Sequence, residues 1–281
     1  MKKRLWIWIL ALLAAICLCG WIAWANTALM VTRLTVQSDA LPELFDGFRI
    51  AHVSDLHNAE FGEGNIELLD LLRQAQPDVI AITGDLIDSR RTDVDVALEF
   101  IREAVKIAPC YFATGNHEAR VTEYPALEQA MAEAGCTVLR GEEAVLSCQG
   151  QTIQILGVDD YTFLPGSNGN DNVEILLAET ATQCREGFNI LLLHRPELAE
   201  RFADLGIELV LSGHAHGGQV RIPWIGGLIA PDQGFFPAYT EGLHTFGNMQ
   251  LVISRGLGNS IIPVRVNNRP EIILITLEGE K

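Results

Sequence analysis

The chain has 281 residues, of which 48% are hydrophobic and 20% are charged, and this balance excludes a disordered or low-complexity protein. Its 36 acidic side chains outnumber its 20 basic ones, and the net charge of −16 disfavours binding to nucleic acid. The length suits one large α/β domain or two small ones.

Residues 5–25 have the composition of a membrane span. They carry no charge, and as a helix rising about 1.5 Å per residue they extend about 30 Å, the thickness of a bilayer core. The cations of residues 1–4 predict a cytoplasmic tip and an extracytoplasmic domain anchored in the cell membrane. A cleaved signal peptide, which would leave a secreted protein, is the alternative. Residues 23–25 read as A-x-A, although the apolar stretch exceeds the usual length of about 7–15 residues.

The rest of the chain alternates short apolar runs with amphipathic patterns. We expect residues 26–40 to connect the span to one domain at residues 41–281. The apolar runs predict strands at 48–54, 79–83, 111–114, 153–158, 190–193, 209–211, 251–254 and 272–276. The amphipathic patterns predict helices at 66–75, 93–107, 124–134, 172–184 and 196–205. Such alternation predicts a mainly parallel sheet with right-handed crossovers.

Polar side chains follow five of the predicted strands. In open α/β sheets, ligands bind beyond the carboxyl ends of the strands. Five of the seven histidines of the chain fall at these places. In chain order the residues are Asp55 and His57, Asp85 and Asp88, Asn116 with His117 and Glu118, His194 with Arg195, and His214 with His216.

The donor types at these places indicate a metal site. Carboxylate, amide and imidazole groups without cysteine suit Mn²⁺, Fe or Zn²⁺. We expect extended backbone to turn both residues of the pair Asp55 and His57 the same way, and likewise His214 and His216. Two metal ions about 3.5–4 Å apart can activate water and stabilise both oxygens of an in-line phosphoryl displacement. Turn and capping roles are the plain alternative, with Asp88 as a helix N-cap.

Together these blocks resemble those of the calcineurin-like metallophosphoesterases, over about residues 45–280. The stretches 213–219 and 255–258 resemble a branch of bacterial membrane-anchored or exported phosphoesterases. The resemblance implies an α/β fold, a four-layer α/β/β/α sandwich with the metals at the edge of two sheets. Here it would be preceded by one N-terminal transmembrane helix.

The resemblance also implies roles for the site residues. The first of two divalent metal ions would be held by Asp55, His57 and His216, the second by Asn116, His194 and His214, and Asp85 would bridge them. A hydroxide shared by the metals would attack phosphorus, with His117 as general acid. Asp88 matches the residue that orients this histidine through its other ring nitrogen. Glu118 ends its block without a defined role.

Some residues keep two interpretations. Arg195 either binds the substrate phosphate or forms an ion pair, and Asp159 and Asp160 either orient the site or cap a turn. Residues 162–172 form a lid or only a connection. Residues 222–231, with Phe235 and Phe236 beyond them, form an apolar edge that meets acyl chains or the bilayer, or else they pack as core.

The sequence therefore predicts a dinuclear metal-dependent phosphoesterase, foremost a phosphodiesterase, that hydrolyses a phosphate ester at the outer face of the membrane. One alternative is a pyrophosphate hydrolase acting on a lipid-linked nucleotide sugar such as UDP-diacylglucosamine, a substrate known from relatives of the resembled family. That sugar is made on the cytoplasmic side, against the predicted topology. The other alternative is a non-catalytic metal-binding scaffold, but every expected ligand position is filled.

Overall fold

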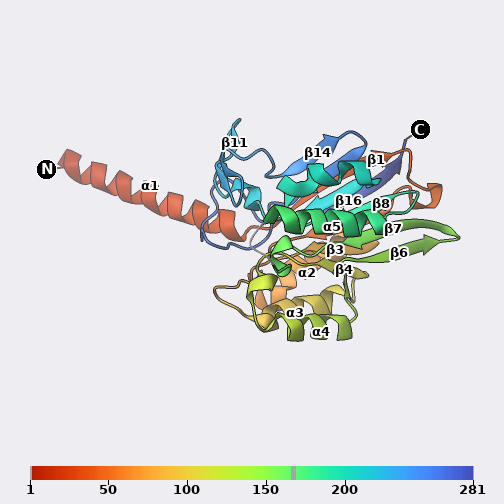
Figure 1. The fold of residues 1–281 in the computed structure, drawn as a ribbon. Coiled ribbons are helices and arrows are strands. Elements are labelled where there is room, and N and C mark those ends of the chain that lie inside the picture. Colours follow the sequence, from red (N-terminus) through yellow and green to blue (C-terminus); the bar gives the residue numbers. More distant parts are fainter. Residues whose placement is uncertain (1, 166–168, 281) are drawn as a thin grey trace.

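A computed structural model describes residues 2–165 and 169–280 (Figure 1). Helix α1 (Lys2–Thr27) projects from one end of a domain built on two six-stranded sheets. It is long and apolar enough to cross a membrane. Helices α3 (Val94–Ala104) and α4 (Tyr124–Glu133) lie together on one side of the sheets, and α5 (Gly169–Gln183) covers the other side.

The first sheet contains the strands that carry the first three blocks of polar residues. Its order is β1 (Met30–Ser38), β16 (Glu271–Gly279), β2 (Arg49–Val53), β3 (Val79–Thr83), β4 (Cys110–Ala113) and β5 (Thr137–Val138). All neighbours are parallel except β16 and β2. Leucines of α2 (Ile66–Ala75) pack on its outer face with α3 and α4, because their apolar stripes recur at helical spacing.

The second sheet carries the histidine blocks. Its order is β14 (Gly242–Phe246), β15 (Met249–Ile253), β9 (Leu209–Ser212), β8 (Asn189–Leu192), β7 (Gln151–Gly157) and β6 (Glu142–Cys148). The four central strands are parallel, and both edge strands pair antiparallel. The 3₁₀ segment η5 (Pro196–Leu205) packs on its outer face with α5.

One buried cluster joins the facing surfaces of the two sheets. It includes Ile50 and Ile275 from the first sheet and Ile155 and Leu211 from the second. Two further clusters lie beneath the outer helices. The four-layer α/β/β/α architecture is therefore confirmed, and so is the mainly parallel pairing.

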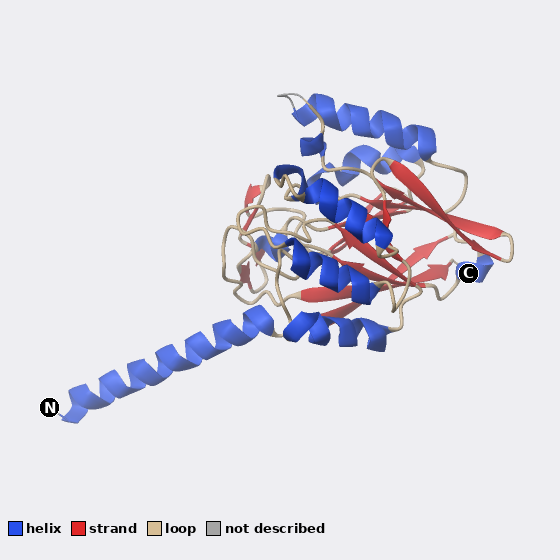
Figure 2. Cartoon of the chain, turned by 90° about the horizontal axis from the view of Figure 1, so that it is seen from below, coloured by secondary structure: helices blue, strands red, loops and turns tan. Residues whose placement is uncertain are grey.

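Short elements gather at the end of the domain from which α1 leaves (Figure 2). Two small antiparallel sheets lie there. One pairs β10 (Arg221–Ile222) with β11 (Gly226–Gly227), and the other pairs β12 (Ile229–Ala230) with β13 (Gly234–Phe235). The remaining 3₁₀ turns are η1 (Glu43–Phe45), η2 (Glu63–Asn65), η3 (Glu118–Arg120), η4 (Tyr161–Phe163) and η6 (His216–Gly218).

The structure differs from the connection expected at residues 26–40. Residues 30–38 are strand β1, which pairs in parallel with β16 over nine residues. Its side chains are mostly half-buried or exposed, so it lacks the continuous apolar run of a central strand. All six cysteines are free, and Cys110 and Cys136 are buried. In the expected lid at residues 162–172, residues 166–168 lie outside the described residues.

Candidate metal centre

The polar blocks meet at the carboxyl ends of parallel strands from both sheets. Strands β2, β3 and β4 lead to Asp55, Asp85 and Asn116, and β8 and β9 lead to His194 and His214. Hydrogen bonds hold the two edges together. Nδ1 of His194 lies 2.6 Å from the carbonyl oxygen of Thr83, and the backbone N–H of His214 donates to both carboxylate oxygens of Asp55 at 3.1 Å.

Left-handed backbone turns aim the candidate ligands. The φ angles of Asp55, His57, Asp85, His214 and His216 are 53°, 47°, 53°, 63° and 46°. Non-glycine residues seldom adopt this region, and it concentrates at functional sites. The expected mechanism, alternation along an extended strand, is therefore wrong, because both residues of each pair lie beyond their strand. His216 also lies beside Asp55 and His57, whereas His214 lies beside Asp85 and His194.

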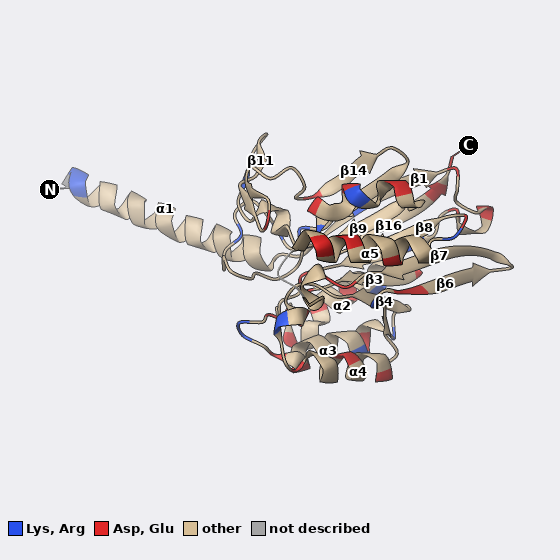
Figure 3. Cartoon of the chain, viewed as in Figure 1, with Lys and Arg blue, Asp and Glu red and all other residues tan. Residues whose placement is uncertain are grey.

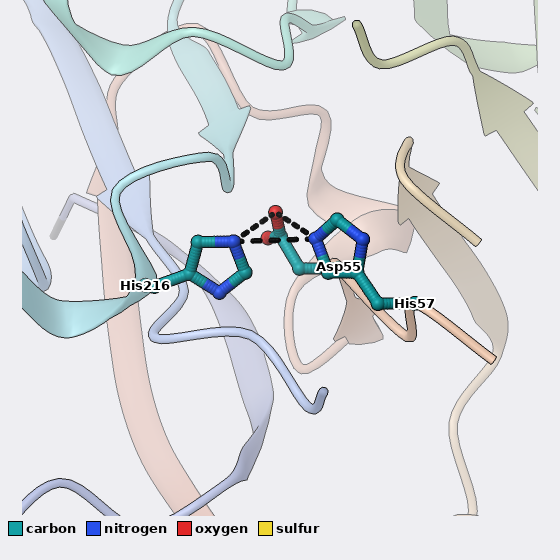
Figure 4. Close-up of side chains that lie close together, drawn as sticks. All are labelled: Asp55, His57 and His216. Atoms are coloured by element: carbon teal, nitrogen blue, oxygen red, sulfur yellow. Dashed lines mark hydrogen bonds and ion pairs between the residues drawn. The ribbon is translucent and has the colours of Figure 1, made fainter. Parts of the chain in front are cut away.

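The first cluster consists of Asp55, His57 and His216 (Figure 4). Oδ1 of Asp55 lies 3.8 Å from Nε2 of His57 and 3.6 Å from Nε2 of His216. The two Nε2 atoms are 3.2 Å apart. All three side chains are buried, so their donor atoms face one another and not water.

The second cluster consists of Asp85, His194 and His214, with Asn116 beside it. Nε2 of His194 lies 3.3 Å from Asn116 Oδ1 and 3.2 Å from Nδ1 of His214. Asp85 connects the clusters, because its Oδ2 is 3.3 Å from Nε2 of His194 and 3.6 Å from Nε2 of His57. This position is the one expected of a bridging carboxylate.

The electrostatics of the two clusters fit divalent cations. Burial lowers the pKa of His57 to about 3 and that of His214 to about 4, so both rings are neutral and have a lone pair to offer. Burial also disfavours a charged His194, yet the nearby Asp85 and Asp55 raise its pKa to about 10. The carboxylates therefore stabilise positive charge beside His194. A bound cation would replace the extra proton of the charged His194 ring.

His117 lies at the open side of the clusters. Its Nδ1 accepts a hydrogen bond from the backbone N–H of Ser89 at 2.9 Å, which leaves the ring proton on Nε2. Nε2 lies 3.2 Å from Oγ of Ser260, beside the pocket. Asp88 was expected to orient Nδ1, but its Oδ1 accepts from the N–H of Arg90 at 2.8 Å. Ser89 orients the ring. The Asp88 carboxylate also lies within 4.8 Å of one of the two ring nitrogens.

Glu118, which has no predicted role, holds two ligand loops together. Its Oε2 accepts the backbone N–H groups of Asp85 and Gly115 at 2.9 and 2.8 Å, and its Oε1 accepts that of Leu86 at 2.9 Å. Gly115 is needed at this approach, because a Cβ there would lie 2.3 Å from Asp85 Oδ1. The buried carboxylate thus fixes the backbone of the bridging residue.

Replacing Glu118 by Gln should destabilise the fold by about 2 to 6 kcal/mol. The amide group that takes the place of Oε2 cannot accept a hydrogen bond, so two buried N–H groups lose their partner at about 1–3 kcal/mol each. Urea unfolding of the full chain in detergent measures the change. Glu99→Gln, on the exposed face of α3, is the matched control and should change stability little. Equal stability of the two variants would contradict this role for Glu118.

Arg195 is not available to bind substrate. Its guanidinium is buried, donates from Nε to Asp160 Oδ2 at 2.6 Å, and forms an ion pair with Asp232. It also lies over the ring of Tyr161, 4.4 Å from the centroid. Asp232 in turn lies 3.0 Å from Nε2 of His214, so Arg195 positions a ligand through Asp232. Asp159 and Asp160 each had two interpretations. Asp160 holds Arg195 and also accepts the backbone N–H of Thr162, as a turn cap does, whereas Asp159 pairs with Arg140.

The clusters open into a pocket of about 380 Å³. Its polar wall includes Asp85, Asn116, His117, His214 and His216, and its other wall is largely apolar, with Ile229, Pro231, Ile261 and Ile262. Asp232 and Ser260 also line it, and sequence reasoning missed both. Neither follows a predicted strand or has ligand spacing, so no local signal marks them.

Arg265 is buried, and the stretch 263–265 also resembles that branch of phosphoesterases, although the sequence indicates no role for this residue. Its Nη2 lies 3.3 Å from Nδ1 of His216 and 2.5 Å from the carbonyl oxygen of Gly258. Its Nη1 donates to the carbonyl oxygen of Arg255 at 2.7 Å. Arg265 therefore connects the first cluster to the segment that forms the far wall of the pocket.

Two mainly parallel sheets, with two His/Asp clusters joined by Asp85 at the edge they share, define a metal-dependent phosphoesterase. Residues 48–218 match the family model of the calcineurin-like phosphoesterases, and the chain belongs to this family. Members of the family depend on two metal ions.

Several curated relatives carry the same family name. The chain is 32% identical to the uncharacterized metallophosphoesterase YkuE of Bacillus subtilis, over 88% of this chain and 85% of that protein. It is 28% identical to the phosphodiesterase YaeI of Escherichia coli, over 82% of each chain. A zebrafish transmembrane protein with a metallophosphoesterase domain is 30% identical over 88% of this chain and 57% of that protein.

Proposed function

We propose that this enzyme is a phosphodiesterase that uses two divalent ions, Mn, Fe or Zn, at the Asp85-bridged clusters. The observation that carries the proposal is the position of Asp85 Oδ2, which lies within 3.6 Å of a ring nitrogen of each cluster. The name of the relative YaeI supports the diester as the substrate. Two ions held here would supply an activated water and offset the charge of the phosphate oxygens.

His117 is the residue that this proposal assigns to the leaving group. Its proton sits on Nε2, because Ser89 donates to Nδ1, and Nε2 faces the pocket. From there it donates a hydrogen bond to the oxygen of the departing alcohol and stabilises the charge that develops on that oxygen. Burial lowers the pKa of His117, while the charges of Asp85 and Asp88 act in the opposite direction. Arg195 and Asp232 orient His214, and Arg265 packs against His216, so the ligands are held by a second layer of contacts.

The diester proposal is tested by turnover of full-length protein in detergent, stripped of metal and reloaded with Mn²⁺. We expect hydrolysis of bis(p-nitrophenyl) phosphate to require metal, with two ions bound per chain and a higher kcat/KM than for p-nitrophenyl phosphate. A preference for the monoester would change the substrate class. Two bound ions without turnover of either ester would favour the alternative of a non-catalytic metal-binding scaffold.

The proposal places the domain at the outer face of the cell membrane, with α1 as an uncleaved anchor. The cations before α1 support this orientation. Packing at the end of α1 supports retention of the helix, because Ala25 is buried against the domain. Protease added to intact spheroplasts should therefore digest the domain. Full protection would put the active site in the cytoplasm and revive the nucleotide-sugar substrate.

A further inference from the structure

Exposed apolar side chains lie in the short strands and turns of residues 224–236 and in the loop that carries Ile261 and Ile262, and we call them the apolar rim. The apolar rim consists of Trp224, Ile225, Phe235, Phe236, Ile261 and Ile262. Trp224 is 103% exposed and Phe235 is 71% exposed. Ile261 and Ile262 line the pocket, and Phe235 pairs with Ile229, which also lines it. An exposed apolar group of this kind marks an interaction surface.

The charge of the molecule makes the apolar rim unusual. Residues 33–281 carry 17 cations and 36 anions, yet residues 222–231 and 256–264 carry none of either. In Figure 3 acidic residues mark α3, α4 and α5, whereas the loops around β11 are mostly uncharged. Asp232, between residues 222–231 and Phe235, is charged, but it is paired with Arg195. Anionic lipid headgroups repel an acidic surface, so this sparsely charged end approaches a bilayer at a lower electrostatic cost than the acidic helices do.

The apolar rim is tied directly to the end of α1. Oδ1 of Asn26 accepts from the backbone N–H of Arg265 at 2.7 Å and from Nδ2 of Asn259 at 3.1 Å. Nδ2 of Asn26 donates back to the carbonyl oxygen of Arg265 at 3.0 Å. Asn259 and Arg265 bracket the loop that carries Ile261 and Ile262. The last turn of α1 therefore holds one side of the pocket mouth.

No flexible linker separates α1 from the domain. Only Ala28 and Leu29 lie between α1 and β1, and the Arg269 guanidinium donates to the carbonyl oxygens of both, at 2.8 and 2.6 Å. The same guanidinium lies 4.8 Å from the ring centroid of Trp24. In Figures 1 and 2 α1 leaves the loop-rich end of the domain, while the C-terminus lies at the far end. With α1 across a bilayer, this end faces the membrane surface.

We propose that the apolar rim docks into the outer leaflet of the bilayer that α1 spans, and that the pocket takes a phosphate ester with a hydrocarbon tail from that leaflet. The proposal rests on the phosphodiesterase function and on α1 as the anchor. Tryptophan and phenylalanine partition into the interface, where the aromatic ring is partly desolvated. The apolar wall at Ile261 and Ile262 leads from the polar clusters to the docked surface, and the tail lies along it.

Docking is measured by the fluorescence of Trp224, the one tryptophan outside α1. Full-length wild type and Trp224→Phe are reconstituted in phosphatidylcholine vesicles with and without brominated acyl chains. The difference between the two proteins isolates Trp224, and Phe preserves the apolar character of the site. We expect the brominated lipid to quench this difference signal. A Trp224 signal of equal intensity in both lipids would overturn the docking proposal.

Substrate delivery is measured with two esters that share one leaving group. Methyl p-nitrophenyl phosphate is offered in solution, and hexadecyl p-nitrophenyl phosphate is embedded in phosphatidylcholine vesicles. The double variant Trp224→Ser with Phe235→Ser should lose at least about tenfold in kcat/KM for the hexadecyl ester, since two interfacial anchors are removed. Its activity on the methyl ester should be unchanged. Val145→Ser, on the exposed face of β6 away from the rim, is the matched control.

The outcomes separate the two proposals. If wild type cleaves neither ester with metal bound, the phosphodiesterase function fails, while the quenching result still decides docking. If both esters are cleaved but the double variant treats them as wild type does, the delivery role of the apolar rim is wrong. Equal losses on both esters would show damage to the pocket and would also overturn the delivery role.

Discussion

Asp85→Asn should reduce kcat/KM for bis(p-nitrophenyl) phosphate by about 10³-fold or more, which corresponds to about 4 kcal/mol of lost transition-state stabilisation. The reason is that one oxygen of this carboxylate serves both clusters, at 3.3 Å from His194 and 3.6 Å from His57. Asn keeps the size of the side chain and an acceptor for the backbone N–H of His117, which donates to Asp85 Oδ1 at 2.8 Å in the wild type. The change therefore removes charge from both cation positions at once.

Metal content distinguishes this effect from unfolding. Asp85→Asn should bind fewer than two ions per chain by mass spectrometry of the metals, with a circular dichroism spectrum like that of wild type. Asp70→Asn, on the exposed face of α2, is the matched control and should behave as wild type. Two tightly bound ions and normal turnover in Asp85→Asn would refute its bridging role.

His117→Ala should slow the release of a poor leaving group far more than that of a good one. We expect kcat to fall about 10²–10⁴-fold for methyl phenyl phosphate, because phenolate is a strong base whose developing charge depends on the hydrogen bond that Nε2 donates. For methyl p-nitrophenyl phosphate, whose leaving group is a weaker base, the loss should be about tenfold or less. The measurement is the ratio of the two rates in wild type and variant.

A residue that only shaped the pocket would lower both rates by the same factor, and that result would contradict the role of His117 at the leaving group. His244→Ala removes a histidine that contacts Tyr239 and lies outside both clusters. It should leave the ratio unchanged. The metal content of His117→Ala should stay at two ions per chain, since its ring is not expected to hold either one.

The strands that the sequence predicts well are those buried on both faces, because every residue in them is apolar or nearly so. Strands β3, β8 and β9 are buried on both faces and read as unbroken apolar runs. Strand β1 has one largely exposed face, and edge strand β6 alternates between half-buried and exposed residues, so neither stands out from a connecting segment. Length and apolar composition likewise suffice to identify α1.

The candidate ligand positions are predictable for a different reason, while their division between two metals rests on the resemblance to a family. Each ligand directly follows a strand, so its place in the sheet follows from the chain order. The contacts that orient the ligands come from residues distant in sequence. Asp232 reaches His214 from a short loop, and Arg265 reaches His216 from beyond the second sheet. The left-handed φ of Asp55 and His57 also depends on the packed turn, since neither residue prefers it.

The two-residue junction between α1 and β1 has a consequence for how far the enzyme reaches. A domain on a long tether samples a volume of the cell envelope, whereas Arg269 and Asn26 hold this domain against the end of its helix. As long as α1 spans the bilayer, the catalytic residues stay at one fixed height above it. Encounters with substrate then follow lateral diffusion within the plane of the membrane. Esters farther out in the envelope lie beyond its reach.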